Sequence, residues 1–504
     1  MKKYIIYSLL IIILSLLFVG CNESKIDNKD NKEKAIDKWN AIPESHNFEI
    51  SIDENDEITI TGVKNLNLED LVIPNMVSYI AKGAFKECWE VTSLVIPESV
   101  KRIDEGAFSG CSSLESITLP FYGDMRRSST DPVQHMFGYI FGREEYGDSY
   151  RVISYSFKYI DNVPIDISVD YYIPQSLRNV VIADCEYIPI RAFDGCGSIR
   201  NITIPDNVII IDNFAFNNCG ITSINFPDGL TSIGNRAFYN CNKLTSITIP
   251  DSVTSIGFGA FMHCTGLESV TLSNNLTVIE TATFDQCSSL DSITIPSSVK
   301  EIKGAAFSYC TNLSSVTISN GVESIGENVF DNCTSLTSIT IPDSVTTIGR
   351  ATFYQCSNLK NVNISNNLTS IEQSVFAYCT SLASVTIPNS VTSIGNNAFS
   401  HCSSLTNIVI PNGVTFIGPR AFEYCKYITK IVIPNSATTI YRNAFDGCPV
   451  LGYVYFDGTI EEWKKIEFAD EKANPMYYAK HFYVLDEKGE VEYNGKHYVE
   501  TKLD

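Results

Sequence analysis

The chain is short of the residues that build most enzyme active sites and nucleic-acid interfaces. It has 6 His among 504 residues, and its 37 Lys and Arg are outnumbered by 58 Asp and Glu, which leaves a formal net charge of −21. A nucleic-acid interface needs a basic footprint, so this acidity argues against one. The sequence also has no His-Glu-x-x-His, no Gly-x-Ser-x-Gly and no phosphate-binding loop. We therefore expect neither catalysis nor a cofactor.

Metal clamps and disulfides have little support either, although the chain has 16 Cys. No Cys-x-x-Cys spacing occurs, which argues against a local zinc site. Most of the cysteines recur in one column, where stacked side chains would lie about 4.8 Å apart, beyond the roughly 3.5–4.5 Å that separates the Cβ atoms of a disulfide. We interpret them as reduced core residues and expect no metal.

What the chain has instead is a repeat. Fourteen times a Phe is followed three residues later by a Cys, and most pairs are 23 residues apart, without a break from Cys241 to Cys448. Ile stands five residues before each Phe, and Leu-x-x-Ile-x-Ile follows many of the cysteines, as in 290–295. This alternation predicts a half-buried strand. A fixed period in the twenties predicts a solenoid, in which each repeat buries its apolar face against its neighbours.

The repeat unit combines Ile-Gly-x-x-Ala-Phe-x-x-Cys with Leu-x-x-Ile-x-Ile and Ile-Pro-Asp-Ser-Val. It resembles the BspA-like (Treponema pallidum type) leucine-rich repeats of bacterial surface proteins. The resemblance implies a β-rich leucine-rich-repeat solenoid of about 14 repeats of 23 residues, with one long insertion and terminal caps. In chain order we expect a lipoprotein signal peptide (1–21), a disordered charged tether (22–45), an N-terminal capping hairpin (46–73), leucine-rich repeats (74–120), an aromatic-rich insertion (121–176), further leucine-rich repeats (177–450) and a C-terminal cap module (451–504).

The N-terminus indicates the compartment. Lys2 and Lys3 precede an uncharged run from Tyr4 to Val19, which is shorter than the about 20 residues of a comfortable membrane span. The motif Phe-Val-Gly-Cys that ends at Cys21 resembles a bacterial lipobox, whose Cys is acylated after cleavage; an uncleaved anchor or a plain signal peptide is the alternative. We expect an exported, membrane-anchored lipoprotein at the cell surface or outer membrane. Ten of the 17 residues from Asn22 to Lys38 are charged, which is typical of a disordered tether.

Three surfaces compete as the binding site. Insertions into solenoids often mark the binding face, and this one contributes the candidates Phe137, Tyr139, Phe141, Tyr146 and Tyr150. The turns after the repeat Phe contribute Tyr309, Tyr354, Tyr378 and Tyr424, since tyrosine is a frequent contact residue at interfaces, although packing between repeats would also use it. Ser and Thr ladders along the strands are the third surface, and they fit a plain solvent face equally well.

Two further expectations concern these surfaces. His263 and His401 each precede a column Cys, and we interpret them as variable turn residues. The repeats on either side of the insertion have their own core residues, so removal of 121–176 should leave the fold intact.

Composition and resemblance together favour binding over catalysis. The resemblance implies adhesion to protein or glycan ligands of the host extracellular matrix, of epithelial surfaces or of other bacteria, with the membrane contacted through the lipid anchor. A structural envelope spacer, or a polysaccharide-binding protein without a host partner, is the alternative.

The substitution Cys21→Ser tests the anchor. We expect the variant to stay unacylated and to move out of the detergent phase in a detergent partition assay. Each buried CH₂ of an acyl chain contributes about 0.8 kcal/mol and a single chain holds only marginally, so stable anchoring depends on the several chains that such a Cys receives. Unchanged partitioning would show that the apolar run itself is the anchor.

Overall fold

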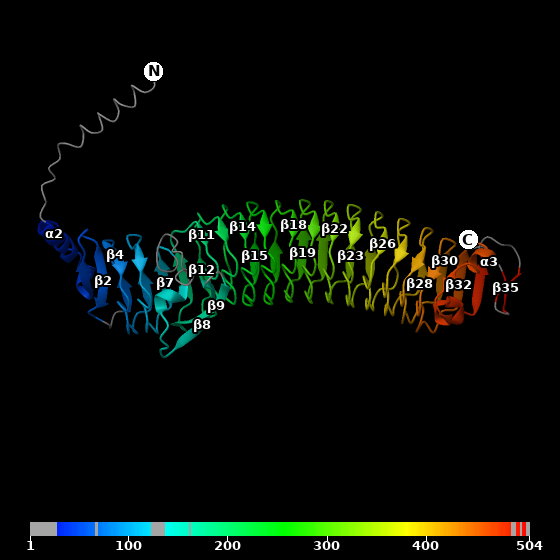
Figure 1. Cartoon of the computed structure of the whole chain (residues 1–504), viewed down its shortest axis with the longest axis horizontal. Coiled ribbons are helices and arrows are strands. Elements are labelled where there is room, and N and C mark those ends of the chain that lie inside the picture. The colour runs from blue at the N-terminus through cyan, green and yellow to red at the C-terminus, as the bar shows by residue number, and fades with distance from the viewer. Residues whose placement is uncertain are drawn as a thin grey trace, which may run out of the picture.

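The protein is an elongated, gently curved solenoid in which successive turns of the chain stack along one axis (Figure 1). The computed structural model describes residues 28–65, 69–121, 137–160, 163–484, 490–493 and 496–499. It contains about 16 turns of about 23 residues, which confirms the solenoid predicted from the period. Besides the repeats with the Phe-x-x-Cys motif, the insertion and the C-terminal module contribute to the stack.

One side of each turn is a strand of the Leu-x-x-Ile-x-Ile motif. In β19 (Ser292–Ile295) exposed and buried residues alternate, because neighbouring side chains of a strand point to opposite faces. It pairs in parallel with β21 (Ser315–Ile318), which sets Ser opposite Ser and Thr opposite Thr on the solvent face. The other strands of this side are β3 (Asp70–Val72), β5 (Ser93–Val95), β7 (Ser116–Leu119), β10 (Asn179–Ile182), β12 (Asn201–Thr203), β15 (Ser246–Thr248), β17 (Ser269–Thr271), β23 (Ser338–Thr340), β25 (Asn361–Asn363), β28 (Asn407–Val409), β30 (Lys430–Pro434), β32 (Tyr453–Asp457) and β34 (His481–Val484).

A second side is built of two-residue strands that end in the repeat Ile. β20 (Glu301–Ile302) pairs in parallel with β22 (Ser324–Ile325), and the Ile of each is buried. A Cβ on Gly326 would lie 2.7 Å from the amide nitrogen of Gly304, so glycine after the Ile allows neighbouring turns to approach. The other strands of this side are β4 (Val77–Ile80), β6 (Arg102–Ile103), β11 (Tyr187–Ile188), β13 (Ile210–Ile211), β14 (Ser232–Ile233), β16 (Ser255–Ile256), β18 (Val278–Ile279), β24 (Thr347–Ile348), β26 (Ser370–Ile371), β27 (Ser393–Ile394), β29 (Phe416–Ile417), β31 (Thr439–Ile440) and β33 (Glu467–Phe468).

The repeat phenylalanines form a continuous column of stacked rings inside the solenoid. From Phe193 to Phe445 neighbouring ring centroids are 5.0–5.6 Å apart, and the ring planes differ by 1–16°. Each ring is fully buried. Aromatic pairs at this separation contribute about 0.5–1.5 kcal/mol each beyond the burial of their area. The column therefore couples each repeat energetically to the next.

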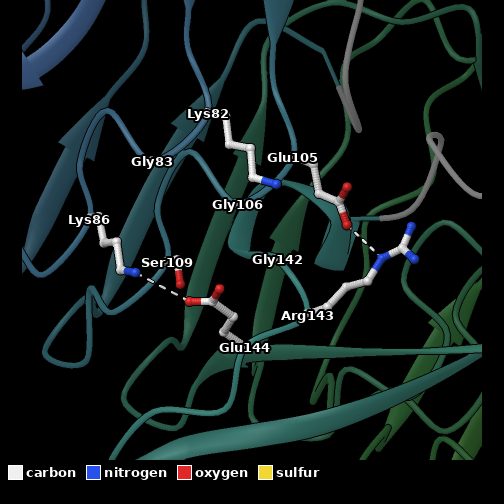
Figure 2. Close-up of a pocket in the computed structure, with 9 residues that line it drawn as sticks. All are labelled: Lys82, Gly83, Lys86, Glu105, Gly106, Ser109, Gly142, Arg143 and Glu144. Atoms are coloured by element: carbon white, nitrogen blue, oxygen red, sulfur yellow. Dashed lines mark hydrogen bonds and ion pairs between the residues drawn. The ribbon is translucent and has the colours of Figure 1, made fainter.

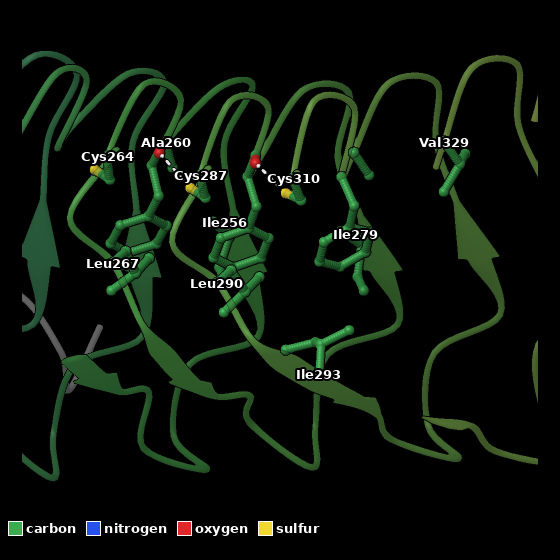
Figure 3. Close-up of a cluster of buried hydrophobic side chains, with 14 of the residues drawn as sticks. Ile256, Ala260, Cys264, Leu267, Ile279, Cys287, Leu290, Ile293, Cys310 and Val329 are labelled. Carbon is green, nitrogen blue, oxygen red and sulfur yellow. Dashed lines mark hydrogen bonds between the residues drawn. The ribbon is translucent and has the colours of Figure 1, made fainter. Parts of the chain in front are cut away.

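The column cysteines lie beneath the same turns, and Figure 3 shows Cys264, Cys287 and Cys310 one behind the other. The thiols of Cys287 and Cys310 donate to the carbonyl oxygens of Phe261 and Phe284, one repeat earlier, at 3.2 Å. The same bond recurs through Cys448. All 15 cysteines that the structure describes are free thiols, and 14 of them are buried. The repeat Cys thus satisfies a turn carbonyl as well as filling the core.

The N-terminal cap differs from the expected tether. Residues 28–40 form the helix α2 (Asn28–Asn40), so the disordered segment predicted over 22–45 is wrong for this part. Ala35 and Trp39 are buried, and the Trp39 ring lies 6.3 Å from that of Phe48. A short helix η1 (Pro43–Asn47) then leads into the antiparallel hairpin of β1 (Phe48–Ile52) and β2 (Ile58–Val63), and β2 pairs with β4.

The insertion supplies part of the core. Its helix η2 (Phe137–Phe141) is fully buried, and the rings of Phe137 and Phe141 bridge Phe108 and Phe193 with centroid distances of 5.2–6.2 Å. The Phe108 amide donates to the carbonyl of Ile140, as a repeat Phe does to the Ala of the next turn. The expectation that 121–176 can be removed without harm is therefore wrong for this segment. The remainder forms the hairpin of β8 (Ser149–Ile160) and β9 (Val163–Pro174), which projects from the side of the rod (Figure 1).

The C-terminal module closes the stack. Its helix α3 (Ile460–Trp463) begins with a capping box between Thr459 and Glu462. Trp463 is fully buried, and its ring lies 4.7–5.4 Å from those of Phe456, Phe468 and Phe482. The short helices η3 (Glu471–Ala473) and η4 (Pro475–Tyr477) precede β34, and β35 (Glu490–Tyr493) pairs with β36 (Lys496–Val499).

The buried thiols predict a loss of stability at alkaline pH. Burial raises the pKa of Cys264 to about 12 and that of Cys287 well above the ordinary value of 9.0. The contribution of these thiols to stability is complete below the pKa of the unfolded thiol, near 9, and is lost as the pH rises toward the folded value. The loss is about 1.4 kcal/mol per thiol and pH unit, because the unfolded chain releases protons that the folded protein retains. We expect the urea midpoint of unfolding to fall steeply between about pH 9 and pH 11.

A double variant provides the control for this prediction. In Cys264→Ala with Cys310→Ala the same pH series should be shallower, because two of the protons that are released on unfolding are gone. Thiolate absorption in the ultraviolet should stay low in the folded protein across the series. A midpoint that does not change with pH would contradict the prediction.

Candidate functional site

The aromatic candidates of the insertion are mostly inside the protein. Phe137, Tyr139 and Phe141 are buried, so their rings are not available to a macromolecular ligand. Tyr146 is half-buried, and its hydroxyl donates to the carbonyl of Tyr172 at 3.0 Å. Burial also raises its pKa. Tyr150 is exposed on β8, which leaves it as the surface residue of this set.

The tyrosines of the repeat turns lie on one edge of the solenoid and reach solvent. The exposed fractions are 48% for Tyr309, 37% for Tyr378 and 43% for Tyr424. Tyr354 is half-buried. The structure brings Tyr354, Tyr378 and Tyr424 together and leaves Tyr309 apart.

The residue that joins them is His401. Its ring stacks on Tyr378 with centroids 4.3 Å apart and planes 15° apart, and lies 4.8 Å from Tyr424 on its other side. Tyr354 meets Tyr378 edge to face at 5.3 Å. We call these four residues the ring ladder. Histidine at 401 was interpreted as a variable turn residue, but it stands directly before a column Cys, as Tyr378 and Tyr424 do, and that shared position is the signal that could have found it.

The ring ladder is uncharged at neutral pH. Burial lowers the pKa of His401 below its ordinary value of 6.5, although the nearby Glu423 opposes the shift. Its Nδ1 lies 2.9 Å from the hydroxyl of Ser400. At its far end the Tyr424 ring covers Gly447, where a Cβ would come within 2.5 Å of the ring. The ladder is thus a neutral aromatic row fixed at several points.

The backbone at these positions is left-handed. Tyr309, Tyr378, His401 and Tyr424 have φ of 55–63°. Other repeats place Asn there, as at Asn332, or glycine, as at Gly447. Glycine and Asn enter this region readily, whereas other residues pay about 1–2 kcal/mol. Bulky rings in strained positions on an exposed edge indicate a role other than stability.

A shallow pocket of about 370 Å³ lies where the insertion meets the first repeats. Figure 2 shows Lys86 directed toward Glu144 and Arg143 toward Glu105, with N···O distances of 3.2 and 2.5 Å. The lining pairs its charges on an exposed surface, where ion pairs contribute little, and includes no histidine. It offers no nucleophile and base in a catalytic arrangement.

The remaining site predictions concern metals and membranes. Within the ranges that the structure describes, no group of three or more His, Cys, Asp or Glu is placed to hold a metal ion. No helix in that same part of the chain is both long and apolar enough to cross a bilayer. Cys21 and the apolar run before it lie outside the described residues.

Comparison with known proteins begins with the repeats. The model of the BspA type leucine-rich repeat region, with six copies, matches residues 47–125, 186–314, 278–406 and 346–474. No curated protein shows significant similarity to the chain.

Solved structures resemble the chain over most of its length. A leucine-rich repeat protein from Bacteroides ovatus has 27% identity and a TM-score of 0.55, over 84% of this chain and 97% of that one. A leucine-rich cell surface protein from Faecalibacterium prausnitzii has 24% identity and a TM-score of 0.34, over 84% and 97%. A leucine-rich repeat protein from Treponema pallidum has 18% identity and a TM-score of 0.22, over 62% and 88%.

The left-handed turn position predicts that Tyr309→Gly stabilises the protein. Tyr309 is exposed and has no ring partner among the described residues, so glycine should relieve backbone strain with little loss of packing. We expect the urea midpoint at pH 7 to rise, by about 1 kcal/mol in free energy of unfolding. Asn332→Gly, at the same position of the next repeat, should gain less, because Asn tolerates this region. A lower midpoint for Tyr309→Gly would contradict the prediction.

Proposed function

Because the chain belongs to the BspA-type leucine-rich repeat family, we propose that it is a non-catalytic binding scaffold of the bacterial surface, held there by lipid on Cys21. Its ligand is a macromolecule of the host matrix, of an epithelial surface or of another bacterium. The lipobox-like N-terminus supports export and anchoring. A rigid solenoid suits this task, because it presents a long edge at a fixed geometry.

The ring ladder carries this proposal. Tyr378 and Tyr424 remain exposed although they stack on His401, and all three occupy left-handed positions at which other repeats use Asn or glycine. A turn that served stability alone would have no reason to place large rings there. Tyrosine gives a large contact area at a low entropic cost and is enriched at the centres of protein interfaces.

The geometry of the ladder favours a protein ligand. Tyr378 and His401 stack face to face, so the stack covers ring faces and leaves edges and polar tips for contact. Edges and hydroxyls suit the mixed apolar and polar surface of a protein. The net charge of −21 adds repulsion against strongly acidic ligands, which favours a neutral or basic partner surface.

The test is a binding screen of the full-length chain in detergent against purified extracellular matrix proteins. The variant combines Tyr378→Asn, His401→Asn and Tyr424→Asn, because Asn already occupies this position at Asn332 and should preserve the turn. We expect affinity for the protein found in the screen to fall at least about 30-fold, which corresponds to the loss of one hot-spot residue of about 2 kcal/mol.

The matched control changes Tyr427 and Tyr477, which are exposed but lie outside the ladder, to Asn. It should bind as the unchanged chain does. Equal loss in control and variant, or no loss in the variant, would remove the ladder as the binding site. Protease treatment of intact cells separates adhesion from an envelope spacer, since an adhesin must be cleaved from outside.

A further inference from the structure

A second pocket lies between the insertion hairpin and the solenoid, far along the chain from the ring ladder. Its volume is about 500 Å³, within the roughly 300–1,000 Å³ of small-molecule sites. One wall comes from β8, with Tyr150, and the other from the turns of the repeats that end in Cys196, Cys219 and Cys241. The site exists because the insertion folds back onto later repeats.

The two walls are held together closely. A Cβ on Gly197 would lie 2.8 Å from the Tyr150 hydroxyl, and one on Gly195 would lie 3.3 Å from Val152. A side chain at 197 would collide with the tyrosine, so glycine there lets the ring rest on the repeat. Tyr150 keeps an exposed fraction of 39% while lining the pocket. Its ring is therefore fixed in place and still accessible.

The repeat wall presents side-chain amides. The Asn240 Nδ2 donates to the Asn218 Oδ1 at 2.7 Å. This bond orients both groups and leaves the Asn218 donors and the Asn240 oxygen without partners among the described residues. Asn242 stands beside them in the lining. Paired amide donors and acceptors match adjacent sugar hydroxyls, each of which both donates and accepts.

The charges around the pocket are already neutralised. Asp194 is buried, and it accepts from Arg191 at 2.6 Å and from Asn217 at 2.7 Å, so both of its oxygens are used. Arg151 is paired with Asp170 at 2.8 Å. Cys219 also lines the pocket, but burial raises the pKa of its thiol to about 12, and it is no nucleophile. Lys243 alone adds an uncompensated charge at the exposed part of the lining.

We propose that this pocket binds a neutral pyranose unit of a glycan, with the Tyr150 ring against the apolar face of the sugar and Asn218, Asn240 and Asn242 on its hydroxyls. Aromatic rings accept the C–H face of a pyranose, and oriented amides supply specificity. The site goes beyond the proposed protein-binding edge and does not depend on it. Glycan and protein would then be bound at separate places on one rod.

The experiment is saturation-transfer NMR on the full-length chain in detergent. The probes are methyl β-galactopyranoside, methyl β-glucopyranoside and N-acetylglucosamine at millimolar concentration, with N-acetylneuraminic acid as the charged comparison. We expect transfer to at least one neutral sugar. Tyr150→Phe should retain it, and Tyr150→Ala should weaken binding at least about fivefold through loss of the ring.

A matched pair guards against misfolding of the hairpin. Asn240→Ala and Asn332→Ala change the same position of two repeats, with φ of 57° and 58°, so they should lose similar stability. Sugar binding should weaken about three- to tenfold in Asn240→Ala alone, as expected for the loss of a hydrogen-bonding group. No transfer to any neutral sugar would overturn the proposal, as would transfer to N-acetylneuraminic acid alone or equal binding by the two Asn variants.

Discussion

Parallel stacking of the phenylalanine rings sets the geometry that the rest of the molecule follows. A ring such as Phe307 touches one ring above and one below, at 5.4 and 5.6 Å, so each turn must deliver its Phe at the same height and orientation. A turn of different length would leave a gap in the column, and buried gaps cost both contacts and the transfer energy of the missing atoms. The constancy of the 23-residue period follows from this requirement.

The insertion shows how strongly that constraint acts. Its segment interrupts the repeat motif, yet Phe137 and Phe141 continue the column between Phe108 and Phe193. The strand side needs no such bridge, because β10 pairs directly with β7. A long excursion is therefore compatible with the solenoid where it returns a ring to the column. The insertion hairpin and its pocket are consequences of that return.

Periodicity made the repeats predictable, since every repeat states the same core positions again. The other features lack that redundancy. The helix α2 carries ten charged residues in its neighbourhood of sequence and buries little beyond Ala35 and Trp39, so composition alone resembled a tether. The Phe-x-x-x-Phe of the insertion has no Cys and escaped the motif. The pocket joins Tyr150 to turns some 45 to 90 residues later in the sequence, and no local pattern records that contact.

One detail of the turns bears on how such a rod changes length. Ser273 donates to the carbonyl of Val253, and the Asn274 and Asn275 amides to Asp251; four repeats later Ser365, Asn366 and Asn367 make the same bonds to Val345 and Asp343. The blocks that carry them are interchangeable in their contacts, so unequal recombination between them would add or delete whole repeats without disturbing the column. The sugar pocket lies before these blocks and most of the ring ladder after them. Gain or loss of a block would leave both sites intact and alter only the distance between them, by about 4.8 Å per repeat.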